Sequence, residues 1–482
     1  MEGEKGMLIV KSPAIVYLDI TYSCNWNCQF CNLKYPSEML PLKVFQRILT
    51  ELKNAEVFEV TLFGGEPLLH PDFFRIAEEI YKTGFYINFV SNGMLISKEN
   101  INLIKQFFKE ASISLHGFED THDKLAGIKG AFKKVIKSLD LLSENGLTTE
   151  ICVTITAINL DEIPQLMKFL LEHYSSFYIS LTLFEPLQGY RMDLVPEYNK
   201  LKSVLKEISE IRKTYPNVYV EPSGACPFCL FPDLELVKKS CWAGILQGAI
   251  DPYGNVKVCS LSRVPVGNIF LHPLTEIWQN SPTIKWFRSL KWITEPCNNC
   301  PLLSKCLGGC KVAGSEPFSP DMLVKIWKDY IKLPEKDDYE SEPSCCSESS
   351  MILGDASLML DERVKLRKDL AGILVRNPYE DYFLLPEETT VLLDYLKHPR
   401  KKNEIIKEFS DFETEELEDF LAKLYHLGII KTVSGREKIM VKKEEKKGDT
   451  IKRLKVFKLT PAGPAEISGA EAMEYFNEIE TS

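Results

Sequence analysis

Residues 13–31 read PAIVYLDITYSCNWNCQFC, an apolar and β-branched run followed at once by three cysteines. The first part has the composition of a buried strand, and the second places Cys24, Cys28 and Cys31 within eight residues. Three thiolates can bind three irons of a 4Fe–4S cluster and leave the fourth iron open to an incoming ligand. Structural iron–sulfur and zinc sites normally use four protein ligands, so the stretch predicts a site kept open for a substrate or cofactor. The alternative is a zinc knuckle that takes a fourth ligand from elsewhere in the chain.

The region from about residue 13 to 215 alternates short apolar runs with longer stretches of helical period. The predicted strands are residues 15–20, 57–63, 86–90, 111–115, 149–155 and 177–183. Stretches such as 42–53 and 131–144 are predicted to form the helices between them. Alternating strands and helices predict a parallel sheet with right-handed crossovers. The expected fold is therefore α/β, a partial (β/α)6 barrel of the TIM type.

Each polar signal in this region follows a predicted strand, which places all of them at one edge of the barrel. In chain order, the signals are the cysteine loop, Gly64-Gly65-Glu66-Pro67, Ser91-Asn92-Gly93, His116-Gly117, Asn159 and Glu185-Pro186. Tyr17, Tyr22, His116 and Glu185 lie near this predicted mouth, and each is equally well explained as a packing residue. The sequence assigns none of them a catalytic role.

Composition and charge exclude some classes of protein. The chain has 482 residues, 45% hydrophobic and 26% charged, with a net charge of −10, which argues against nucleic acid as a partner. Its length predicts two to four domains. No apolar stretch reaches the roughly 18 residues of a membrane span, and the first residues lack a signal-peptide core, so no membrane association and a cytoplasmic location are expected.

The 14 cysteines are concentrated rather than scattered. Thirteen fall within residues 24–31 and 226–346, and only Cys152 stands apart, as a small core residue of a predicted strand. Cytosolic thiols are kept reduced, so a disulfide framework is a poor explanation for this grouping. The pattern predicts that the cysteines bind metal.

The spacing CxxxCxxC, with aromatic Phe30 before the last cysteine, resembles the radical S-adenosylmethionine (SAM) enzymes, and the motif at 64–67 after the second strand supports the likeness. The resemblance implies that SAM binds the open iron and is cleaved to a 5′-deoxyadenosyl radical, with reduced ferredoxin or flavodoxin as electron donor. By the same resemblance the SAM-binding residues are Gly64, Gly65, Glu66, Pro67, Ser91, Asn92 and Ser114. One departure is Ala126, where many relatives carry arginine, so Lys124 or Lys129 is expected to take over an anion contact, or the contact is absent.

The second group of cysteines resembles the SPASM extension of radical SAM enzymes, C-x(9–15)-G-x4-C, gap, C-x2-C-x5-C-x3-C, gap, C. Here Cys241 precedes Gly254 and Cys259, and the later run begins at Cys297. The resemblance implies two auxiliary 4Fe–4S clusters. Its pattern assigns Cys241, Cys259 and Cys310 to the first, with Cys226 or Cys229 as the fourth ligand, and Cys297, Cys300, Cys306 and one of Cys345 or Cys346 to the second. Two zinc ribbons are the alternative, because CxxC pairs suit tetrahedral zinc equally well.

An acidic, serine-rich stretch at 337–350 precedes a new pattern of three short strands and three helical stretches. The strands are expected at 364–367, 372–376 and 381–385, and the helices at 387–396, 402–408 and 414–427, the last with Thr414 as its N-cap and Gly428 at its end. This unit resembles the PqqD-like peptide-binding domain, a small α+β winged-helix-like fold. In that family a leader peptide adds a strand to the sheet edge. A DNA-binding winged helix is the alternative.

The expected domains are a radical SAM partial barrel (1–215), a cysteine-rich SPASM domain (216–350), a PqqD-like domain (351–435) and a C-terminal extension (436–482). Together they resemble maturases that modify a ribosomally made precursor peptide by a thioether, a carbon–carbon crosslink or side-chain oxidation. Ser260 replaces the aspartate of sulfatase-maturing relatives, which disfavours formylglycine formation. The remaining alternatives are maturation of a haem-type or tungsten or molybdenum cofactor, and a non-catalytic iron–sulfur or zinc adaptor.

Overall fold

The structure of the chain is a computed structural model. It describes residues 10–333 apart from 33–36, 175–176, 216–219, 223, 238–239, 315–318 and 320, and beyond them 349–352, 357–370, 372–378, 381–433, 440–443, 457–460 and 463–466. The chain divides into two compact units, of which the first consists of Met1–Met7 and Lys11–Pro334 and the second of Leu8–Val10 and Glu335–Ser482. The finer domain boundaries expected at 215, 350 and 435 remain predictions.

The first unit is built on a curved, mainly parallel sheet. Its central strands are β1 (Ile15–Thr21), β2 (Glu59–Gly64), β3 (Tyr86–Ser91), β4 (Glu110–Ser114), β5 (Thr148–Ile155) and β6 (Phe177–Leu183), which pair in sequence order. Each begins and ends within two residues of its predicted limits. The apolar side chains of β1 are buried on the face that holds Val16, Leu18 and Ile20, as expected of a strand inside an α/β fold. The predicted partial (β/α)6 barrel is confirmed.

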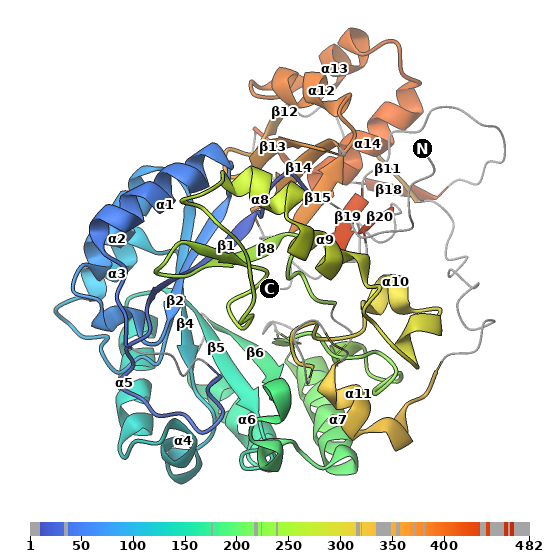
Figure 1. Ribbon diagram of the computed structural model, residues 1–482. Coiled ribbons are helices and arrows are strands. Elements are labelled where there is room, and N and C mark those ends of the chain that lie inside the picture. Colours follow the sequence, from blue (N-terminus) through green and yellow to red (C-terminus); the bar gives the residue numbers. More distant parts are fainter. Residues whose placement is uncertain are drawn as a thin grey trace. The chain divides into compact units, whose positions relative to one another are not determined.

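Helices cover the outer side of this sheet (Figure 1). They are α1 (Leu42–Asn54), α2 (Phe73–Lys82), α3 (Ile101–Phe107), α4 (Glu119–Ala126), α5 (Ala131–Glu144), α6 (Ile163–His173) and α7 (Tyr198–Thr214). Their apolar residues recur at helical spacing: α2, for example, buries Phe73, Ile76, Ala77 and Ile80. The helices therefore form because one stripe of each can be buried against the strands.

The sheet is longer than the six predicted strands. Beside β6 lies β7 (Val220–Pro222), and beside β1 lies β8 (Gln247–Ile250), which is followed by β9 (Asn255–Lys257) and β10 (Pro265–Asn268). Strand β8 is parallel to β1, so the cysteine-rich segment continues the barrel sheet. A buried ion pair of 2.9 Å between Lys257 Nζ and Asp19 Oδ2 joins β9 to β1.

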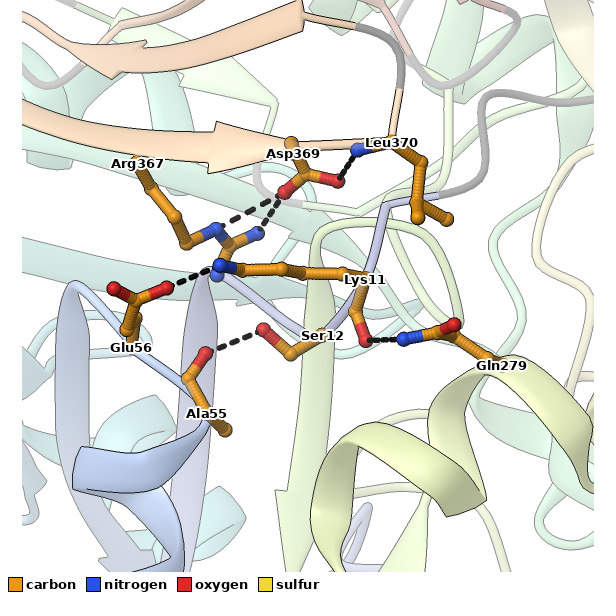
Figure 2. A network of polar contacts seen from close by, with 8 residues as sticks. All are labelled: Lys11, Ser12, Ala55, Glu56, Gln279, Arg367, Asp369 and Leu370. Atoms are coloured by element: carbon orange, nitrogen blue, oxygen red, sulfur yellow. Dashed lines mark hydrogen bonds and ion pairs between the residues drawn. The ribbon is translucent and has the colours of Figure 1, made fainter.

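Short helices complete the cysteine-rich segment: α8 (Leu274–Asn280), α9 (Pro282–Ser289), α10 (Leu303–Cys306) and α11 (Met322–Ile326). Helix α8 packs closely on the added strands, because a Cβ on Gly248 would lie 2.9 Å from the Trp278 ring. The segment that enters β1 is held from two sides (Figure 2): Ser12 Oγ donates to Ala55 O at 2.6 Å, and Gln279 Nε2 donates to Lys11 O at 3.1 Å. Lys11 also pairs with Glu56. The barrel and the cysteine-rich segment thus form one compact unit.

The second unit contains an antiparallel meander of β13 (Lys365–Asp369), β14 (Gly372–Arg376) and β15 (Tyr382–Leu385), followed by α12 (Thr389–Tyr395), α13 (Lys402–Glu408) and α14 (Thr414–His426). Their apolar side chains share one core, in which Phe383 and Phe420 are fully buried. Arg367 donates to Asp369 Oδ2 from Nε at 3.0 Å and from Nη2 at 2.7 Å, a buried pair within β13 (Figure 2). The three strands and three helices agree with the predicted pattern. The winged-helix-like assignment itself remains a prediction.

Several elements of the second unit were not predicted. They are β11 (Ser349–Ile352) with β18 (Met440–Lys443), β12 (Ser357–Leu360) with β16 (Arg400–Lys401) and β17 (Ile430–Thr432), and the hairpin β19 (Phe457–Thr460) and β20 (Gly463–Glu466), which extends the meander beyond β15. The prediction of Thr414 as N-cap is wrong, because Glu413 holds that position and Thr414 is the first helical residue. Gly428 follows the helix with φ +65°, as predicted for its end.

Candidate active site

The loop that carries the first three cysteines follows β1 and is held by the end of α4. Asn27 N donates to Ala126 O at 3.0 Å and Gln29 N donates to Leu125 O at 2.9 Å. Gly127, at φ +69°, is required there because a Cβ would lie 2.4 Å from Asn27 O. Backbone contacts with the last turn of α4 therefore fix the middle of the loop.

The three thiols lie in the loop that follows the carboxyl end of β1. Cys24 is exposed, and Cys28 and Cys31 are half-buried. Partial burial raises the pKa of the Cys24 thiol, and the carboxylate of Glu66 and the thiol of Cys31 raise it further. The donor set is thiolate alone, which fits iron and other soft metals.

The two glycines after β2 permit a very close approach to the start of this loop. Gly65 N donates to Thr21 O at 2.7 Å, and Glu66 N donates to Ser23 O at 2.8 Å. A Cβ on Gly64 would lie 2.0 Å from Thr21 O, and one on Gly65 would lie 2.3 Å from Ser23 O. The glycines thus serve the contact between two backbone segments, and this contact sets where the cysteine loop begins.

Glu66 links the ends of β2 and β3. Its carboxylate is fully buried and accepts hydrogen bonds from Leu68 N at 3.1 Å, Ser91 Oγ at 2.9 Å and Asn92 N at 2.7 Å. Burial raises the pKa of Glu66 to about 7, and these donors act in the opposite direction. Pro67 begins the short 3-10 turn Pro67–Leu69 that follows. Glu66 therefore positions the segment after β3.

Asn92 links the segment after β3 to the first cysteine, Cys24. Its Nδ2 donates to Asn25 Oδ1 at 2.6 Å and lies 3.9 Å from Cys24 Sγ. Ser114, another predicted SAM contact, is half-buried at the carboxyl end of β4. The structure therefore brings Gly64, Gly65, Glu66, Ser91 and Asn92 into one connected network with the cysteine loop.

Aromatic and imidazole rings surround the loop. The Phe30 and His116 rings meet edge to face at 4.7 Å between centroids, and Trp26 and His122 do so at 5.2 Å. Burial lowers the pKa of His116 well below its ordinary value, and burial lowers the pKa of His122 to about 4. Both imidazoles are therefore neutral near pH 7 and act as packing and hydrogen-bonding groups. Asn159 supports this layer by donating from Nδ2 to His116 O at 2.7 Å.

Trp26 and His122 were not predicted as site residues. His122 reaches the loop because Nδ1 accepts from His116 N at 3.0 Å, a contact that depends on how α4 packs after β4. Ala126 stands where many relatives carry arginine, and its side chain is fully buried beneath the loop. Lys124 and Lys129 are exposed. In this segment the contacts with the cysteine loop are made by backbone carbonyls, those of Leu125 and Ala126.

A second set of thiols comprises Cys241, Cys259 and Cys310. Burial raises the pKa of Cys259 to about 12, and the Cys241 thiol raises it further. Lys311 lies beside the set: Nζ donates to Ala243 O at 3.1 Å and to Cys241 O at 3.3 Å. Thiols held protonated in this way become ligands when a metal displaces the proton. The structure thus brings together the three cysteines predicted for the first auxiliary cluster.

A third set contains four thiols. Burial raises the pKa of Cys229 to about 12, and the thiols of Cys306, Cys297 and Cys300 raise it further, in that order. Phe228 N donates to Cys306 Sγ at 3.4 Å, which joins this segment to α10. Cys229 thus lies with Cys297, Cys300 and Cys306, whereas the sequence pattern offered it to the other set. Cys345 and Cys346 lie outside the described residues.

Within the part of the chain that the structure describes, no three His, Cys, Asp or Glu side chains converge closely enough to hold a single metal ion. A 4Fe–4S cluster distributes its protein ligands over different irons, so its thiols lie further apart than those around one ion. The chemistry of the three thiol sets fits iron–sulfur clusters. Among the described residues, no helix is long and apolar enough to cross a membrane.

The comparison with protein families identifies two domains. Residues 18–170 match the radical SAM superfamily, and residues 241–301 match the iron–sulfur cluster-binding domain SPASM. The first match contains the cysteine loop and the segments after β2 and β3. The second contains Cys241, Cys259, Cys297 and Cys300.

Individual relatives are distant. The chain is 23% identical over 325 residues to the PqqA peptide cyclase of Methylorubrum extorquens, covering 63% of this chain and 81% of that one. It is 23% identical over 320 residues to the AdoMet-dependent heme synthase of Methanosarcina barkeri, covering 62% and 92%. Among solved structures it resembles Streptococcus suis SuiB bound to S-adenosylmethionine, with TM-score 0.55 and 21% identity over 65% of this chain and 77% of that one. SuiB bound to precursor peptide SuiA gives TM-score 0.55 and 20% identity over 65% and 76%.

These findings agree with the geometry of the site. The chain is an enzyme that contains a radical SAM domain and an iron–sulfur cluster-binding domain, and its cofactors are 4Fe–4S clusters and SAM.

Proposed function

We propose that this enzyme modifies a side chain of a ribosomally made precursor peptide. The observation that carries the proposal is the connected network at the sheet edge, in which the segments after β2 and β3 fix a three-thiol loop. Support comes from two relatives that act on or bind peptides by name, the PqqA peptide cyclase and SuiB with its precursor peptide SuiA. The modification formed is a thioether, a carbon–carbon crosslink or an oxidised side chain.

Cys24, Cys28 and Cys31 are the proposed ligands of the cluster that binds SAM. When bound, this cluster and SAM supply a 5′-deoxyadenosyl radical that removes hydrogen from an unactivated carbon. Gly65 and Glu66 position the loop, Ser91 donates to Glu66, and Asn92 presents a polar group beside Cys24. Gly64, Pro67 and Ser114 complete the proposed SAM-binding residues. Phe30 and Trp26 pack against His116 and His122 at the same edge.

The two further thiol sets are the proposed auxiliary clusters. Cys241, Cys259 and Cys310 are the ligands of one, and Cys297, Cys300 and Cys306 with Cys229 are the ligands of the other. Cys229 is the proposed fourth ligand of the latter cluster because its thiol lies among those of Cys297, Cys300 and Cys306. Cys345 or Cys346 is the alternative there, and Cys226 is the remaining thiol. These clusters would take an electron from the substrate radical, with reduced ferredoxin or flavodoxin supplying the electron for SAM cleavage.

The second unit is proposed to capture the leader part of the peptide. Its meander β13–β15 beside α12–α14 has the composition of a small sheet-and-helix module, and an extended peptide can add to the edge of such a sheet. A strand-addition site of this kind reads backbone hydrogen bonds, so it suits substrates whose leader sequences vary. No nucleic-acid or membrane partner is proposed, and the proposed location is cytoplasmic.

The direct test is incubation of the reconstituted, dithionite-reduced enzyme with SAM and the peptides of short open reading frames next to its gene. We expect 5′-deoxyadenosine and a peptide whose mass falls by a small multiple of the hydrogen mass, as a crosslink or an oxidation requires. Cys28→Ala should abolish both products because it removes a proposed ligand of the SAM-binding cluster. Cys152→Ala is the cysteine control, since Cys152 lies in β5 and belongs to none of the three thiol sets. Deoxyadenosine with every candidate peptide unchanged in mass would contradict the proposal.

Maturation of a haem-type cofactor is the second candidate, favoured by the similarity to the heme synthase. That match and the match to the peptide cyclase cover nearly the same share of this chain, 62% and 63%, so coverage does not separate the two candidates. The two candidates separate in one experiment, because a haem precursor supplied in place of the peptide would change its visible absorption spectrum only under the second.

A further inference from the structure

Glu185 is a buried carboxylate with one oxygen that no described residue hydrogen-bonds. It follows β6 at the same sheet edge as the cysteine loop, and its side chain is buried, with the residue 7% exposed. Its Oε2 atom makes no hydrogen bond among the described residues. A buried carboxylate with an unsatisfied oxygen is costly unless a cation or metal meets it. An oxygen of this kind is what a missing metal group would leave behind.

The segment that carries Glu185 packs on the last cysteine of the second thiol set. Leu187 shares a small apolar cluster with Cys310 and Ala313, and Gln188 N donates to Gly314 O at 3.2 Å. The charges agree with this placement. After burial, the carboxylate of Glu185 is the strongest influence raising the pKa of Cys310, and Cys241 contributes to the raised pKa of Glu185. Glu185 therefore lies at the edge of the set formed by Cys241, Cys259 and Cys310.

The other polar groups near this set already have partners. Both carboxylate oxygens of Asp321 accept backbone bonds, Oδ2 from Cys310 N at 2.8 Å and Oδ1 from Leu323 N at 2.8 Å. Cys226 Sγ already donates to Pro227 O at 3.8 Å, and after burial its pKa is raised by Asp321 and Glu185 and then by the thiols of Cys306 and Cys229, two members of the four-thiol set. Lys311 is a cation and cannot ligate while protonated. Of these groups, Glu185 is the one with an oxygen left for a metal.

We propose that Glu185 is the fourth protein ligand of the cluster bound by Cys241, Cys259 and Cys310, through Oε2. The inference rests on the proposed ligation of that cluster by the three cysteines. One iron of the cluster then carries an oxygen ligand and three carry thiolates. A carboxylate binds iron less strongly than thiolate does, and replacing thiolate by a weaker donor raises the reduction potential, as histidine does in Rieske centres. The cluster is thereby a better electron acceptor than an all-cysteine one.

The test compares Glu185→Gln, Glu185→Cys and Cys226→Ser, each in a chain whose first cluster is removed by Cys24→Ala, Cys28→Ala and Cys31→Ala. The readouts are iron per chain, the Mössbauer spectrum and the reduction potential followed by electron paramagnetic resonance, none of which needs turnover. Glu185→Cys should keep the iron content and shift the potential downward. Glu185→Gln should lose the distinct oxygen-ligated iron from the spectrum. Cys226→Ser should match the parent.

Unchanged spectra and potential in both Glu185 variants would overturn the proposal, and so would a potential shift in Cys226→Ser. Because Glu185→Cys restores a ligand, it keeps the test decisive where Glu185→Gln fails to fold. Cys241→Ser distinguishes an error in the proposed cluster from an error in the proposed carboxylate ligand. If it leaves the iron content unchanged, the proposed cluster itself is wrong. If it loses iron while both Glu185 variants match the parent, the carboxylate ligand alone is wrong.

Discussion

Gly65 shows how a single missing side chain sets the geometry of the site. Three backbone atoms of Tyr22 and Ser23 lie within 2.8 Å of where its Cβ would be. The close approach lets Gly65 and Glu66 donate to the residues just before Cys24. The motif after β2 therefore acts on the cysteines through the backbone, in addition to any contact with a bound cofactor.

Gly65→Ala is expected to displace the cysteine loop. The backbone must shift to admit the methyl group, at a cost of about 1–3 kcal/mol for overpacking. We expect the loss of about four irons per chain, those of one 4Fe–4S cluster, and of deoxyadenosine formation. Iron analysis and chromatography of the products measure both.

Gly84→Asn is the matched control for this substitution. Gly84 has φ +81°, which asparagine tolerates, and nothing lies within 4 Å of its Cβ position. The control should keep the iron content and activity of the parent. A Gly65→Ala enzyme with unchanged iron and activity would show that the loop does not depend on this contact.

At the scale of elements, the pairing of β8 with β1 joins the two cofactor-binding regions. Asp19 of β1 and Lys257 of β9 are both buried, with side chains 0% and 4% exposed. Burial raises the pKa of Asp19, and Lys257 acts against that rise. Removing one partner from such a pair leaves an uncompensated buried charge.

Lys257→Met is therefore expected to destabilise β1 and β9 by about 3–5 kcal/mol. The loss should be smaller in mildly acid than in mildly alkaline buffer. In the variant Asp19 has a folded-state pKa above its unfolded value, so stability is lost as the pH rises through that window. Hydrogen exchange of the β1 and β9 amides measures the local opening free energy.

Two further variants make this prediction sharp. Asp19→Asn combined with Lys257→Met should recover much of the stability, because no charge is then buried. Lys200→Met removes an exposed pair with Asp161, 2.6 Å apart, and should cost about 0–1 kcal/mol. Equal losses in Lys200→Met and Lys257→Met would refute the role given to burial.

The sequence predicted the elements whose patterns are local. The limits of β6, α5, β14 and α13 were predicted to the residue, because the periodicity of buried side chains marks them. Strand β8 was missed because its four residues form a strand through pairing with β1. The hairpin β19–β20 lies in a stretch read as an extension, and it too depends on pairing, with β15.

The residues of the candidate site likewise include some that the sequence predicted and some that it did not. The first three cysteines and the motifs after β2 and β3 are each short runs in the sequence, so their resemblance to known family motifs identified them. Trp26, His122 and the placement of Cys229 depend on contacts between distant segments. Such contacts follow from packing and leave no pattern in the neighbouring residues.

At the scale of the whole molecule, the chain consists of two compact units, to which we assign different functions. The first holds the cysteine loop and the further thiol sets, and the second holds the proposed leader-binding module. Each unit has its own core, so a ligand that binds one unit stabilises that unit in the first place. Mass action sets the size of the effect, about 2.7 kcal/mol when the ligand is at 100 times its Kd.

Hydrogen exchange of the full chain should therefore separate the two binding events. SAM should slow exchange in the cysteine loop and in the segments after β2 and β3, which the network through Glu66 and Asn92 connects. The precursor peptide should slow exchange in β13 of the second unit, the edge strand of the meander, because strand addition protects the amides of a sheet edge. A peptide that lacks its leader is the control and should leave the second unit unprotected. Protection by the full peptide confined to the first unit would mean that the leader binds at the barrel, and the second unit would then need another purpose.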